Sequence, residues 1–337
     1  MDAAAAGLYH RPMASIAALP TLDDVLAAAR AIEGRVHVTP SFSSATLSER
    51  AGAPVWLKAE LFQRVGAFKP RGAFNRMRAL SAEERERGVI AISAGNHAQA
   101  LAVAARDLGV DALILMPADA SPPKVAATRG YGAQVDLESA DSVEALRRMR
   151  EIAEATGRVI IHPYDDAMVI AGQGTVGLEL VDQVPELDVV IVPIGGGGLI
   201  SGIATAVKEL RPQVRMIGVE PELASAMHDA LEQGGPVSMV PGPTIADALK
   251  APVAGELCHE ICSRLVDEVV LVDEDAIAEA TRFLYQRAKL AAEAGGAVGV
   301  AALLSGRLDV GGATGVAVVI SGGNISGELS ASVLDPR

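Results

Sequence analysis

The chain has 337 residues, 50% of them apolar, and a formal net charge of -13 from 29 basic and 42 acidic residues. Its length and apolar content allow a large buried core, in one large domain or two. The acidic balance argues against nucleic acid and anionic membrane as main partners, because both bind basic patches. The composition therefore predicts a globular protein with a small-molecule partner.

The N-terminal stretch MDAAAAGLYHRPMAS lacks a basic segment followed by an apolar core, and no apolar run approaches the roughly 18 residues of a membrane span. We expect a cytoplasmic protein whose residues 1–20 form a flexible tail. Cys258 and Cys262 lie four residues apart, on one face of a predicted helix. Because no second ligand pair stands at metal spacing, we interpret both as structural, reduced thiols.

From residue 89 the chain alternates short β-rich runs with helical patterns. The strand VIAIS precedes a helix from about Gly95 to Leu108, in which apolar residues recur every 3.6 positions. The strands ALILM, AQVDL and RVIIHP follow, separated by a helix entered through SPPKVAATRG and a helix from about Ser142 to Thr156 that Gly157 ends. Strands joined by helices in this way predict a small parallel sheet.

A second series of strands follows, with the sequences DVVIVPI, VRMIGVE, EVVLV and VAVVI, and VWLKAE near residue 55 is predicted to join them. We expect an α/β fold of two parallel-type domains, the smaller inserted in the larger. The large domain is predicted to comprise residues 1–84 and 165–337, and the small domain residues 85–164.

Three segments stand where predicted strands end: SAGNH (93–97), GGGGLISG (195–202) and SGGN (321–324). In open parallel sheets, ligands gather beyond the carboxyl ends of the strands. The glycines allow close backbone approach before a helix N-terminus, which suits a phosphate, although the spacing matches neither common nucleotide motif. SAGNH either caps its helix or binds a carboxylate, and Ser321 either caps its turn or bonds a ring nitrogen.

The segment VGAFKPRGAFN, residues 65–75, places Lys69 among mostly small or apolar residues. With the three loops it resembles the fold-type II pyridoxal-phosphate enzymes (tryptophan synthase β-like), in particular the threonine/serine dehydratase and serine racemase family. The resemblance runs from about Thr21 to Ile325 in one collinear order, through TPSFSSATLSE, VWLKAELFQRVGAFKPRGAFN, SAGNHAQALA, MPADASPPKVAATRGYGA, IHPYDDAMVIAGQGTVGLEL, VPIGGGGLISGIA, GVEP and SGGN.

The resemblance implies a role for each matching residue. Lys69 carries pyridoxal 5'-phosphate covalently and is the general base, Phe68 lies against the cofactor, and Asn96 meets its 3-hydroxyl. Ser321 faces the pyridine nitrogen. The cofactor phosphate is bound by Gly195, Gly196, Gly197, Gly198 and the backbone of Leu199. The substrate carboxylate is taken by the backbone of Ser93, Ala94, Gly95, Asn96 and His97.

The implied activity is that of an ammonia-lyase, a dehydratase that eliminates water from a 3-hydroxy amino acid of the L-threonine or L-serine type and forms a 2-oxo acid and ammonia. A homodimer is expected. Serine racemases carry a serine where this chain has Ala94, so dehydration is favoured over racemisation. Metal-dependent members place an aspartate six residues after Glu220, where Ala226 stands, so Glu220 is a weak candidate and we expect no metal.

Two other enzyme classes are alternatives to an ammonia-lyase. A β-replacement synthase of the cysteine synthase type usually carries threonine at the position of His97. A dinucleotide-dependent oxidoreductase could use the glycine loop and Glu220, but it would leave Lys69 and Ser321 unexplained.

Other departures from the family pattern concern the substrate and regulation. Ala67 replaces a common serine and Ala248 a common glycine, which is either neutral or shapes the pocket for another 3-hydroxy amino acid. Because the sequence ends soon after SGGN, we also expect no regulatory domain of the kind found in longer biosynthetic threonine dehydratases.

Overall fold

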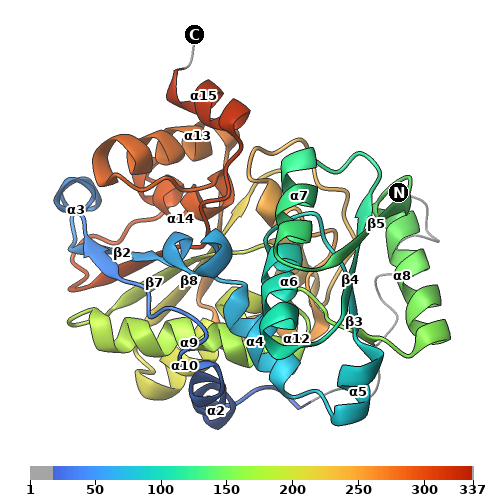
Figure 1. Cartoon of the computed structure of the whole chain (residues 1–337). Coiled ribbons are helices and arrows are strands. Elements are labelled where there is room, and N and C mark those ends of the chain that lie inside the picture. The colour runs from blue at the N-terminus through green and yellow to red at the C-terminus, as the bar shows by residue number, and fades with distance from the viewer. Residues whose placement is uncertain (1–17, 336–337) are drawn as a thin grey trace.

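The computed structural model describes residues 18–335, which form two α/β bodies, each built on its own sheet (Figure 1). The larger sheet has six strands in the order β1-β2-β10-β7-β8-β9, with β1 antiparallel and the others parallel. Their bounds are β1 Ser41–Ser43, β2 Val55–Ala59, β7 Val189–Pro193, β8 Arg215–Pro221, β9 Glu268–Val272 and β10 Val316–Ile320. The antiparallel edge strand β1 was not predicted, because three residues are too few for a pattern.

Alternate side chains of the central strands enter two cores, one on each face of this sheet, because successive strand residues point to opposite faces. Ile191 and Val318 pack in the core that contains α14, whereas Val190 and Val319 pack in the core that contains α10. Since both faces are covered, β7 and β10 read as continuous apolar runs. The helices here are α2 Leu22–Ile32, α3 Ala45–Ala51, α4 Pro70–Arg78, α9 Ala167–Gln183, α10 Gly198–Leu210, α11 Ala226–Gln233, α12 Glu256–Leu265, α13 Glu274–Phe283, α14 Ala294–Leu304 and α15 Gly327–Leu334.

The smaller sheet is entirely parallel, with the strand order β5-β4-β3-β6. Helix α8 packs on one of its faces and α6 on the other, together with Phe74 and Met77 of α4. The strands are β3 Val89–Ile92, β4 Ala112–Pro117, β5 Gln134–Ser139 and β6 Val159–Ile160, and the helices are α5 Ala82–Arg87, α6 Asn96–Leu108, α7 Pro122–Gly130 and α8 Ser142–Thr156.

The predicted fold class is confirmed, and most elements stand where the sequence placed them. Helix α6 begins at Asn96 because Gly95 is its N-cap residue, and β6 is shorter than RVIIHP suggested. The strands of the small sheet all fall within residues 89–160, although the exact domain boundaries stay a prediction. The predicted tail lies, up to residue 17, outside the described residues.

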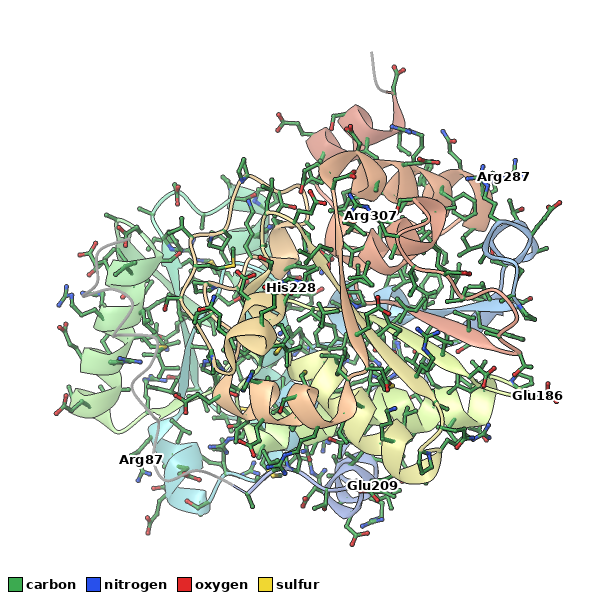
Figure 2. The ribbon with its side chains drawn as sticks, turned by 180° about the vertical axis from the view of Figure 1, so that it is seen from behind. Arg87, Glu186, Glu209, His228, Arg287 and Arg307 are labelled. Carbon is green, nitrogen blue, oxygen red and sulfur yellow. The ribbon has the colours of Figure 1, made fainter. Side chains whose placement is uncertain are left out.

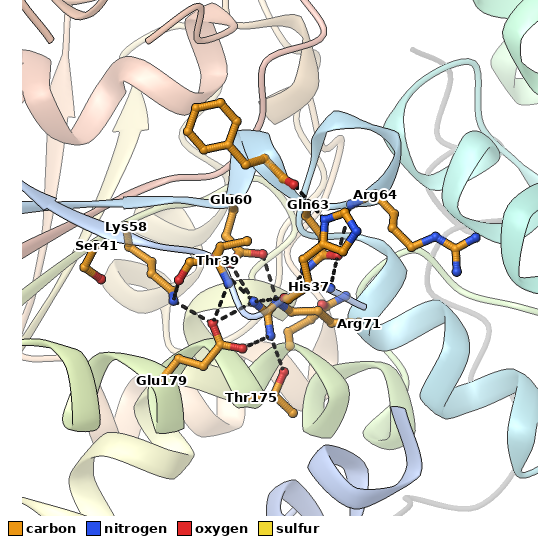
Figure 3. Close-up of polar contacts among 12 residues, drawn as sticks. His37, Thr39, Ser41, Lys58, Glu60, Gln63, Arg64, Arg71, Thr175 and Glu179 are labelled. Carbon is orange, nitrogen blue, oxygen red and sulfur yellow. Dashed lines mark hydrogen bonds and ion pairs between the residues drawn. The ribbon is translucent and has the colours of Figure 1, made fainter. Parts of the chain in front are cut away.

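Helix α4 is fixed to the large body by a buried ionic cluster beneath its first turn, which consists of Lys58, Glu60, Arg71, Glu179 and the Thr39 hydroxyl (Figure 3). The Arg71 guanidinium donates to Glu60 Oε1 and Oε2, both at 2.8 Å, and to Glu179 Oε1 and Oε2 at 2.6 and 2.9 Å. Lys58 Nζ donates to Glu179 Oε2 at 2.6 Å. The two cations and the two carboxylates balance, so α4 is held without a net buried charge.

Other charged side chains lie on the outside of the molecule. Seen from behind, Arg87, Glu186, Glu209 and Arg287 project from its edges (Figure 2), and all four are exposed. Within residues 18–335, no helix combines the length and apolarity needed to cross a bilayer.

Candidate active site

A cavity of about 510 Å³ lies where strands of both sheets end, and it collects all of the predicted site residues except the weak metal candidate Glu220. Its walls include segments that follow β3, β7 and β10, as the rule for parallel sheets predicts. The predicted residues among its lining are Phe68, Lys69, Ser93, Ala94, Gly95, Asn96, His97, Gly195, Gly196, Gly197, Gly198, Leu199 and Ser321.

Lys69 stands at the N-cap position of α4, with Pro70 as the first helical residue. Its Nζ donates to Pro163 O at 2.7 Å and lies 5.0 Å from the centre of the Phe68 ring. Burial lowers the pKa of Lys69 to about 8, because a charged amine loses its hydration in the cavity wall. A sizeable fraction of the side chain is therefore a neutral amine near pH 7 to 8, the form that acts as nucleophile and base.

The Lys69 loop is joined to the SGGN segment by main-chain hydrogen bonds. Phe68 N donates to Ser321 O at 3.1 Å, and Gly323 N donates to Gly66 O at 2.9 Å. This pairing places Lys69 next to Ser321, which is 5% exposed. The two segments are far apart in the sequence, but together they form one wall of the cavity.

The glycine loop between β7 and α10 leaves no room for larger residues. Gly197 has a φ of +100°, and a Cβ on Gly196 would lie 2.5 Å from the Tyr164 ring. No side chain caps the start of α10, so its first backbone N–H groups stay available to a ligand. A close backbone turn at a helix N-terminus fits a phosphate group.

The segment Ser93–His97 connects β3 to α6, again with no side-chain cap on the helix. A Cβ on Gly95 would meet nothing within 4 Å, so the loop borders open space. His97 points away from solvent, its ring is 4% exposed, and its Nε2 lies 3.0 Å from Ile161 O. Because a carbonyl only accepts, His97 carries its proton on Nε2, and burial together with the Lys69 charge lowers its pKa to about 3.

His162 is a second neutral histidine in the cavity wall, and it was not singled out from the sequence. Its Nδ1 accepts from Asp165 N at 2.7 Å, which leaves the ring proton on Nε2. Burial, and then the Lys69 charge, lowers the pKa of His162 to about 4. The segment IHPYDD belonged to the quoted resemblance, but its spacing alone gave His162 and Tyr164 no role.

Glu293 and Asn324 also line the cavity and were missed as site residues. Glu293 is 5% exposed, and its Oε1 accepts from Asn96 Nδ2 at 2.7 Å. Burial raises the pKa of Glu293 to about 7, because the carboxylate has little solvent around it. Glu293 follows a π-helical turn, Leu284–Ala288, which no sequence pattern predicted.

The weak metal candidate Glu220 has another task in this structure. Its oxygens accept from Met227 N at 2.9 Å and His228 N at 2.8 Å, so it caps the first turn of α11. Burial raises the pKa of Glu220 to about 8. Within residues 18–335 no group of three or more His, Cys, Asp or Glu side chains could hold a metal ion. That the protein needs no metal stays a prediction.

The chain is similar to known proteins over most of its length. Residues 32–322 match the family described as Pyridoxal-phosphate dependent enzyme. The chain is 48% identical over 290 residues to an L-threonine ammonia-lyase of Thermotoga maritima, covering 86% of this chain and 72% of that protein. It is 44% identical to the catabolic L-threonine dehydratase TdcB of Escherichia coli K12, covering 86% and 88%.

The fold is also similar to that of solved structures. Maize serine racemase superposes with a TM-score of 0.87 at 38% identity, covering 93% of this chain and 96% of that chain. The processed form of threonine deaminase isoform 2 from Solanum lycopersicum superposes with a TM-score of 0.88 at 35% identity, covering 97% and 98%.

The chain therefore belongs to the pyridoxal-phosphate dependent enzyme family. Its cofactor is pyridoxal phosphate, as the sequence predicted. The residues present fit this group: the glycine turn excludes any Cβ beside Tyr164, and a desolvated amine stands in the same cavity.

Proposed function

We propose that this protein is an ammonia-lyase that removes water from L-threonine or L-serine and yields a 2-oxo acid and ammonia. Relatives 43–48% identical to this chain are named L-threonine ammonia-lyase or L-threonine dehydratase, which bears out the predicted dehydratase activity. The observation that carries the proposal is the desolvated Lys69 amine in a cavity where Ala94 offers no second acid–base group.

Lys69 holds the cofactor and moves the substrate proton. Pyridoxal phosphate, when bound, supplies an electron sink for the pair left behind by the α-proton. The Lys69 amine would accept that proton, and its pKa of about 8 suits proton transfer near neutrality. Pro163 O, 2.7 Å from Nζ, orients the amine.

The other residues bind and orient. The N–H groups of residues 195–199 hold the phosphate, and those of residues 93–97 hold the substrate carboxylate at the start of α6. Asn96 would donate to the phenolic oxygen of the cofactor, Ser321 would face the ring nitrogen, and Phe68 would lie against the ring, since all three line the cavity. A serine hydroxyl, unlike a carboxylate, does not hold that nitrogen protonated, which favours prompt loss of the β-hydroxyl.

The test is a parallel measurement of ammonia and of the enantiomers of the remaining amino acid, with L-threonine and L-serine as substrates. We expect 2-oxo acid and ammonia with little D-enantiomer, and no turnover by Lys69→Ala. Faster formation of D-amino acid than of ammonia would overturn the assignment in favour of a racemase. A product that incorporates an added thiol would identify a β-replacement synthase instead.

We further propose that the enzyme acts in the cytoplasm as a homodimer. Two large apolar side chains are exposed beside each other on the surface, Phe42 at 44% and Phe62 at 47%. The two phenylalanine rings meet edge to face, 6.1 Å apart, and contiguous apolar surface of this kind favours a protein contact. Sedimentation of the wild type and of Phe62→Glu tests this, because the substitution should produce monomers if this surface is the contact.

A further inference from the structure

Asn324, the last residue of SGGN, joins three loops of the active site. Its Nδ2 donates to Val65 O at 2.8 Å, in the loop before Lys69, and to Asn96 Oδ1 at 2.7 Å, in the segment Ser93–His97. Val65 has a φ of 58°, a conformation that a β-branched residue rarely adopts. The same amide thus holds a strained residue of the Lys69 loop and the side chain of Asn96.

The hydrogen bonds leave Asn96 one orientation of its amide. Val65 O is a backbone carbonyl and can only accept, so Asn324 must turn its NH₂ group toward it. The second hydrogen of that NH₂ group goes to Asn96, which therefore presents its oxygen to Asn324. The Asn96 NH₂ group then faces the other way, where Glu293 Oε1 accepts at 2.7 Å.

Glu293 contacts both Asn96 and the SGGN segment. Its backbone N donates to Gly322 O at 3.0 Å, so the carboxyl group is anchored to the same SGGN segment. Of the residues that the structure describes, Glu293 is the one that accepts from Asn96 Nδ2. One hydrogen of that nitrogen is left for a molecule in the cavity that Asn96 lines.

We propose that Asn324 is a positioning residue, which fixes the Asn96 amide so that its NH₂ group, and not its carbonyl oxygen, faces the phenolic oxygen of the cofactor. This inference rests on the proposed placement of Asn96 beside that oxygen. An asparagine amide left free could present either end, and a carbonyl turned toward a phenolate would repel it.

Two substitutions separate positioning from packing. In Asn324→Asp the shape is kept, but a carboxylate cannot donate to Val65 O, and it would accept from Asn96 Nδ2 and turn that amide around. In Asn324→Ala the Asn96 amide is merely released. Positioning therefore predicts that Asn324→Asp harms the cofactor site more than Asn324→Ala, whereas a packing role predicts the reverse order.

The readouts are the dissociation constant for pyridoxal phosphate, measured by rebinding to cofactor-free protein, and the absorption maximum of the bound cofactor. We expect the constant to rise about tenfold or more in Asn324→Asp, the effect of losing one hydrogen bond to a charged group. Asn75→Asp is the matched control, because the Asn75 amide donates to Met168 O at 2.7 Å outside these contacts. In that control both readouts should stay close to wild type.

A double-mutant comparison with Asn96→Ala tests separately whether Asn324 acts through Asn96 and whether Asn96 lies beside the cofactor. If Asn324 acts through Asn96, Asn324→Asp should change the constant by less than about twofold in the Asn96→Ala background. The proposal would be overturned if the Asn324→Asp and Asn96→Ala substitutions raised the dissociation constant independently, so that their effects multiplied. It would also be overturned if Asn324→Ala weakened cofactor binding more than Asn324→Asp. If Asn96→Ala alone leaves both the constant and the absorption maximum unchanged, the placement of Asn96 beside the cofactor is wrong, and the proposal falls with it.

Discussion

At the scale of single residues, the chemistry depends on what burial does to titrating groups. Burial lowers the pKa of Lys69, His97 and His162, so these three basic side chains of the cavity wall carry at most one positive charge between them near neutral pH. The two histidines are then hydrogen-bonding groups rather than acids, and Lys69 is the one of these three that can exchange a proton near pH 8.

The pKa of Lys69 predicts how cofactor attachment depends on pH. Only the neutral amine attacks the aldehyde, so in cofactor-free protein the attachment rate should rise with pH and level off above about pH 8. Stopped-flow absorbance over a pH series measures this, with Lys69→Ala as the control that shows no attachment. A rate still climbing at about pH 10 would indicate an ordinary lysine.

At the scale of elements, the position of Lys69 depends on how α4 is anchored. Arg71 lies two residues after Lys69 and is 0% exposed, with Glu60 and Glu179 as its carboxylate partners. Burial alone would raise the pKa of Glu60, but the Arg71 charge and hydrogen bonds lower it below its usual value. The Glu60–Arg71 pair thus stays ionised at neutral pH, and removal of Arg71 leaves the Glu60 carboxylate charged and buried.

Arg71→Met should therefore lower the free energy of unfolding by about 3–5 kcal/mol, the usual cost of breaking a buried ion pair from one side. Arg147→Met is the control, because the Arg147–Glu151 pair is exposed and such pairs contribute at most about 1 kcal/mol. Urea unfolding of both variants measures the difference. Equal losses would show that the cluster is not what anchors α4.

The glycine loop makes a second prediction at this scale. Gly196→Ala should weaken cofactor binding by about tenfold or more, because the added Cβ forces the Tyr164 ring or the phosphate turn to shift. Gly130→Ala is the matched control, since a Cβ there meets nothing within 4 Å. Equilibrium binding of pyridoxal phosphate compares the two. An unchanged affinity in Gly196→Ala would mean that the loop does not bind the phosphate.

At the scale of the whole molecule, the cavity lies between two bodies that an ion pair joins. Lys124 of α7 and Asp247, both in the lining, meet at 2.7 Å between Nζ and Oδ2. Their side chains are 33% and 52% exposed, so solvent screens the attraction. The pair connects the small body to the large one at the wall of the cavity.

Lys124→Gln should raise the KM by up to about fivefold at low salt, and the difference from wild type should vanish at about 0.5 M salt. Lys208→Gln, which removes a comparable pair with Asp267 away from the cavity, should leave the KM unchanged at both salt concentrations. Steady-state kinetics at two ionic strengths provide the measurement. A salt-independent effect would point to a direct contact with substrate.

Local patterns predicted the parallel strands of both sheets, and the motifs that carry the family resemblance indicated the residues of the site. Lys69 and the glycines could be found because their chemistry needs fixed neighbours along the chain. Glu293, Asn324 and His162 could not, because their roles depend on contacts across the fold: Glu293 and Asn96 are separated by 197 positions. Such contacts leave no periodicity in the sequence. The ionic cluster around Arg71 could not be predicted from the sequence for the same reason.

The central place of β10 in the large sheet determines how the chain can fold. Residues 316–320 pair with both β2 and β7, and the contact between Val65 and Asn324 spans 259 positions. During synthesis one edge of β2 therefore stays unpaired until residues 316–320 have been made, and pairings between such distant segments form slowly. Folding intermediates of this protein are accordingly exposed to aggregation, and the cofactor can be captured only after the final strand has inserted.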